Sequence, residues 1–201
     1  MLTLEQNERY QDRMKRKKAI IDERIANATE ERGVLILMKG NGKGKSSSAL
    51  GTMARSVGHG KKCGVIQFIK GRDVTGEFLF FKDHPMIDWH VMGHGFTWET
   101  QDHNEDTQAA EKAWAIATDM LNNPEYGLIV FDEMSYPLKY KNLQIEPVIE
   151  ALQSRPEMQN VIVTGRAMPK ELEEIADTIS EVRDERHAFR LGVKAQAGIE
   201  F

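Results

Sequence analysis

MKGNGKGKSSSALG, residues 38–51, is a glycine-rich stretch that follows the apolar run VLILM and precedes a helical pattern. A loop of this composition between a buried strand and a helix is typical of a phosphate-binding loop. The common pattern GxxxxGK(S/T) places its first glycine at position 39, but Lys39 is there and the glycine is Gly40. The loop is therefore shorter than usual by one residue, which raises the question of whether it still binds a phosphate.

The shortened loop retains every group that phosphate binding requires. Its three glycines let the backbone turn N–H groups inward, its last lysine supplies a positive charge, and its serine supplies a hydroxyl for a magnesium ion. All of these groups lie at a helix N-terminus, which favours anions. We predict that the loop binds the phosphates of a nucleotide through Gly40, Asn41, Gly42, Lys43, Gly44, Lys45 and Ser46.

After Gly33, short apolar runs alternate with helical patterns. Runs rich in Val and Ile and separated by helices are typical of a parallel sheet buried on both faces. We predict an α/β fold with a doubly wound, mostly parallel sheet, whose ligands bind beyond the carboxyl ends of the strands. The expected strands are residues 34–39, 63–70, 86–92, 127–133, 160–165 and 178–184, and the connections at 71–85 and 93–104 are expected to be long loops.

The apolar run GLIVFDE, residues 127–133, ends in two acids at the carboxyl end of an expected strand. Asp132 and Glu133 would therefore face the same crevice as the phosphate loop, where an acid can hold a metal or position a water. The alternative is an acidic turn that only ends the strand. Arg55 lies nine residues after Ser46 on the next helix, and it either reaches the nucleotide or ends a surface face.

Residues 3–32 read as a helix with a basic segment at residues 9–18, which holds six basic residues and one acid. We treat residues 1–32 as a helical extension and residues 33–201 as one α/β domain, because the chain is too short for two large cores. The basic segment is either a solvated helix face or a cover for an anionic ligand or a partner subunit.

Composition limits the possible partners and compartments. The formal net charge of −4 and the pI near 5.9 give no global field that favours nucleic acid or an anionic membrane. A single cysteine, Cys63, excludes an internal disulfide and reads as a buried, reduced thiol. The apolar runs are too short to span a bilayer, so we expect a cytoplasmic protein that binds neither nucleic acid nor membrane.

The loop HGFTWETQ, residues 94–101, carries two large aromatic residues, Phe96 and Trp98. In an extended loop both would lie on one side, either packed into a core or forming a flat apolar wall for a planar ligand. His90 and His94 do not share a helix face, so the sequence gives little support for a metal site there. The residues alone therefore indicate an ATP or GTP binder without naming a reaction.

Six segments in the same order resemble the P-loop type ATP:corrinoid adenosyltransferases: GNGKGKS, VGHGKKCGVIQFIKG, GFTWET, FDE, VIVTGR and HAFRLGVKAQAGIEF. The resemblance extends from about Arg9 to the last residue and implies a RecA-like P-loop NTPase fold. These enzymes transfer the 5′-deoxyadenosyl group of ATP to the cobalt(I) of a corrinoid and release tripolyphosphate. The nucleophile is then the metal of the substrate, so the protein needs no general base.

The resemblance also assigns roles to individual residues. It implies that Lys45 stabilises the leaving triphosphate, that Ser46 and Glu133 hold magnesium, and that Phe96 and Trp98 press on the lower face of the corrin ring. It further implies a homodimer in which the basic N-terminal helix covers the corrinoid. A flavoprotein or another reductase would supply the electrons in cobalamin synthesis or salvage.

Some positions depart from the family pattern. Ser46 stands where threonine is usual, residues 72–74 replace a common tryptophan and proline, and Arg190 occupies a position that is often acidic. These departures affect the expected corrinoid contacts more than the expected nucleotide site. The sequence does not determine which corrinoid is preferred. A conventional P-loop kinase or ATPase and a nucleotide-dependent binding module are the alternative functions.

Overall fold

A computed structural model describes residues 3–69, 74–92 and 103–201. The chain divides into two compact units, residues 1–31 and residues 32–201. The first unit contains one helix, α1 (Leu4–Asn27), and the second contains the sheet with all the other helices.

Helix α1 begins with a capping box, in which Thr3 and Gln6 exchange side-chain to backbone hydrogen bonds. It ends at Asn27, where the following residue, Ala28, donates its N–H to the carbonyl of Ile25. The helix predicted for residues 3–32 is therefore confirmed but ends earlier than expected. None of its residues is buried. In the described part of the chain, α1 and the other helices are too short or too polar to cross a membrane.

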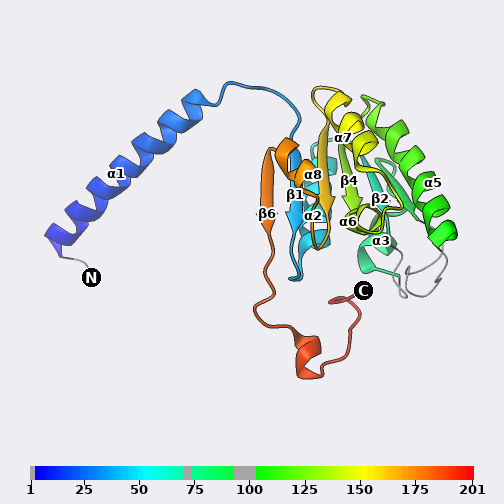
Figure 1. The fold of residues 1–201 in the computed structure, drawn as a ribbon. Helices are drawn as coiled ribbons and strands as arrows, with labels where there is room; N and C mark the ends of the chain where they lie inside the picture. Colours follow the sequence, from blue (N-terminus) through cyan, green and yellow to red (C-terminus); the bar gives the residue numbers. More distant parts are fainter. Residues whose placement is uncertain (1–2, 70–73, 93–102) are drawn as a thin grey trace. The chain divides into compact units, whose positions relative to one another are not determined.

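Six strands form one sheet in the order β3-β2-β4-β5-β1-β6 (Figure 1). Every neighbouring pair is parallel, and Leu37 in β1 lies opposite Val163 in β5 and Ile179 in β6. The prediction of an α/β fold with a parallel sheet is confirmed. The strands are β1 (Leu35–Lys39), β2 (Lys62–Gln67), β3 (Ile87–Val91), β4 (Tyr126–Asp132), β5 (Asn160–Thr164) and β6 (Thr178–Glu181).

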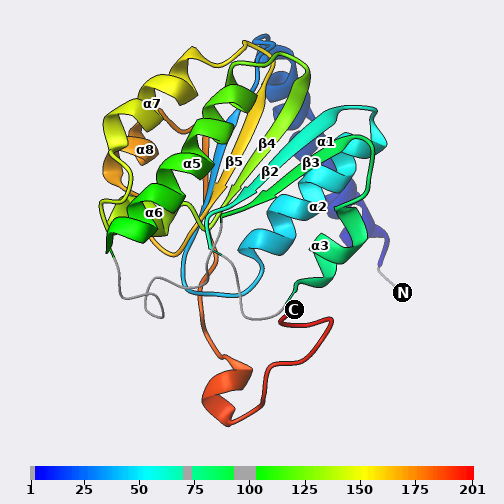
Figure 2. The ribbon, with the colours of Figure 1, turned by 90° about the vertical axis from the view of Figure 1, so that its right-hand side faces the viewer.

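Helices cover both faces of the sheet (Figure 2). Helices α2 (Lys45–Gly58) and α3 (Gly76–Phe81) lie on one face, whereas α5 (His103–Leu121), α7 (Ile145–Ser154) and α8 (Lys170–Ile175) lie on the other. The shorter α6 (Ser135–Lys139) follows β4, and the 3-10 helix η1 (Ala188–Leu191) lies near the C-terminus. Because the strands are parallel, their carboxyl ends meet at one edge of the sheet, where the ligand was predicted to bind.

The expectation of one long irregular connection at residues 71–85 is wrong in part, because α3 lies within it. Thr75 caps this helix by accepting a hydrogen bond from the N–H of Phe78 at 3.3 Å. The ring of Phe78 then packs edge-on against Trp89 of β3, with the ring centroids 5.8 Å apart. The helix is therefore stabilised by a contact with a residue of the next strand, which the pattern of residues 71–85 alone does not reveal.

Phe131 of β4 lies at the centre of the core on the α5 side of the sheet. Its side chain is fully buried. Its ring packs edge-on against Phe68, with centroids 6.1 Å apart, and against Trp114 of α5, with centroids 6.0 Å apart. This cluster fixes β4 against α5. It thereby fixes the position of the two acids at the end of β4, Asp132 and Glu133.

Replacing Phe131 by alanine should destabilise the protein by roughly 3–5 kcal/mol, because the cavity left behind adds to the lost burial of the ring. The matched control is Phe189→Ala, since Phe189 is 77% exposed and its loss should change the free energy of unfolding by only about 0.5 kcal/mol. Urea unfolding followed by circular dichroism measures both. Equal losses for the two variants would contradict the central place of Phe131 in the core.

Cys63 is fully buried in β2, and burial raises the pKa of its thiol to about 11. Since the thiolate is the reactive form, we expect no reaction of the folded protein with Ellman's reagent at about pH 8. The same reagent should titrate the thiol after unfolding in denaturant, which serves as the control. Rapid labelling of the folded protein would show that Cys63 is accessible.

Candidate functional site

The carboxyl ends of four strands surround a cavity of about 980 Å³. The phosphate loop follows β1, Gln67 ends β2, the acids Asp132 and Glu133 close β4, and Arg166 follows β5 closely. Residues of the C-terminal segment 184–201 line the cavity on another side. The sheet topology therefore gathers charged groups from distant parts of the chain around one space.

The glycines of the phosphate loop are required by its geometry. Gly40 and Gly44 have φ angles of 114° and 116°, in the region that favours glycine. A Cβ atom on Gly40 would lie 2.3 Å from the carbonyl oxygen of Val182, and one on Gly42 would lie 2.4 Å from that of Arg183. The loop therefore packs directly against the backbone that follows β6, and side chains at these positions would force the two apart.

Internal hydrogen bonds hold the loop in this conformation. Gly40 donates its N–H to the carbonyl of Arg166 at 3.0 Å, and Gly42 donates to the carbonyl of Val182 at 2.8 Å. Lys39, which occupies the first position of the usual pattern, lies in β1 and pairs with Glu173 of α8 at 2.5 Å. The loop thus starts at Gly40, and the N–H groups of Gly40 and Gly42 are used within the protein.

Lys45 at the start of α2 is a buried cation, with only 7% of its surface exposed. Its ammonium donates a hydrogen bond to the carbonyl of Gly42 at 3.0 Å. Burial lowers the pKa of the Lys45 ammonium, although the charge of Glu133 opposes this shift. A desolvated ammonium that lines a cavity gains more from an added anion than an exposed one does.

Asp132, the last residue of β4, and Glu133, which follows it, have different environments. The carboxylate of Asp132 accepts a hydrogen bond from the Thr164 hydroxyl at 2.6 Å and another from the Gln67 amide at 3.4 Å. One carboxylate oxygen of Glu133, Oε2, is buried and has no hydrogen-bond partner among the described residues. Burial and the nearby Asp132 charge raise the pKa of the Glu133 carboxyl. Glu133 is therefore the acid with an oxygen left for a ligand.

Arg166 is a site residue that the sequence reasoning did not single out. It lines the cavity, and its charge acts on both Lys45 and Glu133. Its backbone N–H donates to the hydroxyl of Ser135 at 3.2 Å, which fixes the turn after β5. The available signal was its position just beyond the carboxyl end of a buried strand, in the quoted segment VIVTGR.

The C-terminal segment forms part of the site through ion pairs. Lys43 of the phosphate loop pairs with Glu200, and Arg190 pairs with Asp184. Arg190, a departure from the family pattern, therefore has an acid to neutralise it within the same segment. The segment brings both cations and anions to the cavity edge.

The structure brings together most of the predicted binding residues but not all. Asn41 and Ser46 line the cavity with the rest of the loop, and Glu133 lies opposite. Arg55 is exposed in the last turn of α2, about 15 Å along the helix axis from Lys45, and it does not line this cavity. Phe96 and Trp98 lie outside the described residues, as do Arg72 and Asp73.

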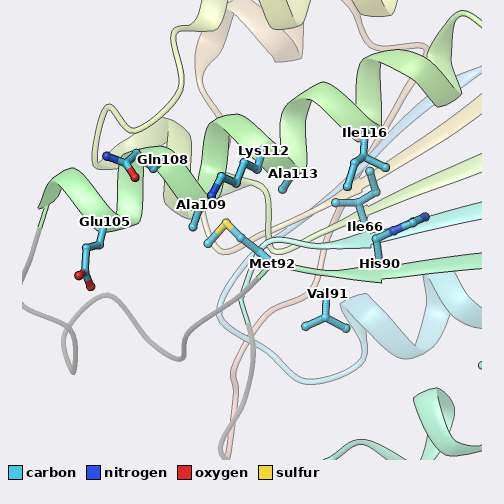
Figure 3. Close-up of a pocket in the computed structure, with 10 residues that line it drawn as sticks. All are labelled: Ile66, His90, Val91, Met92, Glu105, Gln108, Ala109, Lys112, Ala113 and Ile116. Atoms are coloured by element: carbon cyan, nitrogen blue, oxygen red, sulfur yellow. The ribbon is translucent and has the colours of Figure 1, made fainter.

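A second cavity of about 440 Å³ lies between β3 and α5 (Figure 3). Apolar and polar groups contribute about equally to its walls, with Ile66, Met92 and Ile116 among the apolar residues and His90, Glu105 and Lys112 among the polar ones. Met92 is the last described residue before the segment 93–102, which contains the predicted aromatic pair. The cavity thus adjoins the point where the chain leaves the sheet toward that segment.

The chain is similar to known proteins over nearly its whole length. A sequence model of the family described as ATP:corrinoid adenosyltransferase BtuR/CobO/CobP matches residues 31–201, and one described as Cob(I)alamin adenosyltransferase N terminal matches residues 3–25. Corrinoid adenosyltransferases of Pseudomonas aeruginosa, Escherichia coli (strain K12) and Salmonella typhimurium are 52%, 46% and 47% identical to the chain. The alignments cover 97–98% of the chain and 98–99% of each relative.

The resemblance inferred from the short segments is therefore confirmed over nearly the whole chain. The phosphate loop, Glu133 and the cations around them line one cavity, and the description of the matched family names ATP. With the family matched over residues 31–201 and relatives this similar in sequence, the chain belongs to the ATP:corrinoid adenosyltransferase family.

Proposed function

We propose that this chain transfers the 5′-deoxyadenosyl group of ATP to the cobalt(I) of a corrinoid and releases tripolyphosphate. The observation that carries the proposal is the convergence of Lys45, Arg166 and the unpartnered oxygen of Glu133 on the cavity at the phosphate loop. We also propose a RecA-like P-loop fold, because β5 lies between the phosphate-loop strand β1 and the acid-bearing strand β4.

Ser46 and Glu133 are suited to hold a magnesium ion. Both line the cavity, and one oxygen of Glu133 is buried without a hydrogen-bond partner among the described residues. Magnesium prefers oxygen ligands and is commonly held by one or two protein groups together with phosphate oxygens and waters. The bound ion would neutralise charge that develops on the departing triphosphate.

The phosphate loop and its neighbouring cations act on the leaving group. Lys45 and Arg166 carry positive charge toward the space where the phosphates would lie, and α2 adds the N–H groups of its first turn. Fixed charges in a partly desolvated cavity stabilise developing negative charge without reorganising first. Because the N–H groups of Gly40 and Gly42 already donate to protein carbonyls, the later part of the loop would supply the groups that stabilise the leaving triphosphate.

The nucleophile in this reaction is the cobalt of the substrate, and it forms a bond to the 5′ carbon as the carbon–oxygen bond to the triphosphate breaks. The electron pair of the broken bond leaves with the triphosphate, so no proton has to be removed. The protein's remaining task is to align cobalt with the 5′ carbon. We propose that Phe96 and Trp98 contribute an apolar wall on the lower corrin face.

A conventional P-loop kinase or ATPase would use the same loop, and it is the second candidate. In that reaction an acid beside the γ-phosphate positions a water or a hydroxyl group. Asp132 already has two hydrogen-bond partners within the protein, which leaves Glu133 for the metal. The homodimer, the reductase partner, the cytoplasmic location and a role for Arg55 stay predictions.

The direct test is anaerobic incubation with ATP, magnesium and chemically reduced cob(I)alamin. We expect the absorption spectrum of adenosylcobalamin to appear with the enzyme and not without it. Binding of magnesium and ATP without any adenosylated corrinoid would contradict the proposed function.

Lys45→Ala should lower the rate of adenosylation roughly 100-fold to 1000-fold, because a buried cation that stabilises the leaving group is lost. The loss should be similar whether cobalt(I) is supplied chemically or made from cobalt(II) by a reductase. The control is Lys61→Ala, since Lys61 immediately precedes β2, at the opposite edge of the sheet. Wild-type rates for Lys45→Ala would remove the support for the phosphate assignment.

Replacing Phe96 and Trp98 together by alanine should impair turnover from cobalt(II) far more than turnover from prepared cobalt(I). An apolar wall that excludes a lower axial ligand makes cobalt(II) easier to reduce, whereas prepared cobalt(I) needs no such help. Both rates are measured by the formation of adenosylcobalamin. Equal losses on the two routes would indicate that the pair only packs in the core.

A further inference from the structure

Thr164, the last residue of β5, is fully buried beside the two acids at the end of β4, Asp132 and Glu133. Its hydroxyl accepts a hydrogen bond from the backbone N–H of Glu133 at 2.9 Å and donates one to the carboxylate of Asp132 at 2.6 Å. One hydroxyl group thus contacts the backbone of one acid and the side chain of the other. The contact joins two strands, because β4 and β5 are neighbours in the sheet.

The backbone of Glu133 needs such support. Its φ angle is 56°, in the left-handed region that side chains other than glycine rarely adopt. Residues in this region persist where surrounding contacts hold them, and they are common at functional sites. The hydrogen bond from the Glu133 N–H to Thr164 is a contact of this kind, made at the strained residue itself.

The contacts of Asp132 show that this acid is part of the support. Its second carboxylate oxygen accepts from the amide of Gln67, whose own oxygen accepts from the indole N–H of Trp89 at 3.1 Å. Both carboxylate oxygens of Asp132 are therefore engaged by the protein. Glu133, by contrast, keeps the oxygen Oε2 without a partner among the described residues.

We propose that Thr164 is a positioning residue that holds the turn at Glu133, so that the Glu133 carboxylate is presented to a divalent cation at the phosphate loop. The inference rests on the proposed function, in which Glu133 and Ser46 hold the metal. Thr164 itself contacts neither the metal nor the nucleotide. Thr164 acts on the cation through Glu133, in the way that hydrogen-bond partners of metal ligands generally orient those ligands.

The test measures metal binding without turnover. Manganese(II) replaces magnesium, adenylyl imidodiphosphate replaces ATP, and electron paramagnetic resonance reports free manganese in the absence of corrinoid. Thr164→Val and Thr164→Ala both remove the hydroxyl, and Thr164→Ser keeps it. The matched control is Thr118→Val, because the Thr118 hydroxyl donates to the carbonyl of Trp114 within α5 and bonds no other group among the described residues.

We expect the valine and alanine variants to bind manganese roughly 10-fold to 100-fold more weakly than the wild type. The serine variant and Thr118→Val should stay close to the wild type, and affinity for the nucleotide measured without metal should be unchanged in all four. A merely structural role would lower the melting temperature and leave the manganese affinity unchanged. That outcome, or failure of both hydroxyl deletions to fold, would overturn the proposal.

Glu133→Gln separates this inference from the proposed function. If wild-type protein binds no manganese, or Glu133→Gln binds it as well as the wild type, the assigned metal site is wrong. If Glu133→Gln weakens binding while Thr164→Val does not, only the role of Thr164 is wrong.

Discussion

The close packing of the phosphate loop against the backbone after β6 is the constraint on which the rest of the site depends. Gly40 and Gly42 allow this approach because a Cβ atom at either position would meet a carbonyl oxygen at 2.3–2.4 Å. Two loop N–H groups are satisfied by protein carbonyls, so the loop has its shape before any ligand binds. The first turn of α2, with Lys45 and Ser46, is thereby aimed at the cavity.

Charge balance around the cavity follows from this arrangement. Lys45 is buried, and its direct hydrogen bond goes to a neutral carbonyl of the loop. Lys43 is paired with Glu200 of the C-terminal segment. Burial shifts the pKa values of Lys45 and Glu133 toward their neutral forms, so each gains from an opposite charge in the cavity. A triphosphate with a divalent cation would supply both charges at once, which supports the proposal that this space binds ATP with magnesium.

Much of the fold could be predicted from the sequence because its signals are local. The apolar runs correctly predicted the six strands of the described sheet. The spacing of the glycines, with Lys45 and Ser46, correctly predicted a loop between a strand and a helix. The run GLIVFDE placed Glu133 correctly at the end of β4. The short helix α3 was missed, because it is stabilised by the contact of Phe78 with Trp89 of β3, which lies outside the segment 71–85.

The parts of the site that were not predicted depend on long-range pairing. Arg166 and Thr164 gain their positions only when β5 inserts between β1 and β4, and no spacing in the sequence gives that strand order. The C-terminal segment has little regular structure, so its place along the cavity could not be read from periodicity. Arg55, in contrast, is close to the loop in the sequence, but it does not line the cavity.

The most direct test of the central claim is phosphorus NMR of the products formed from ATP and chemically reduced cob(I)alamin. A phosphate loop that holds the whole triphosphate as a leaving group should yield tripolyphosphate in equal amount to adenosylcobalamin. The appearance of ADP and orthophosphate without tripolyphosphate would contradict the claim, because the loop would then be moving a γ-phosphoryl group.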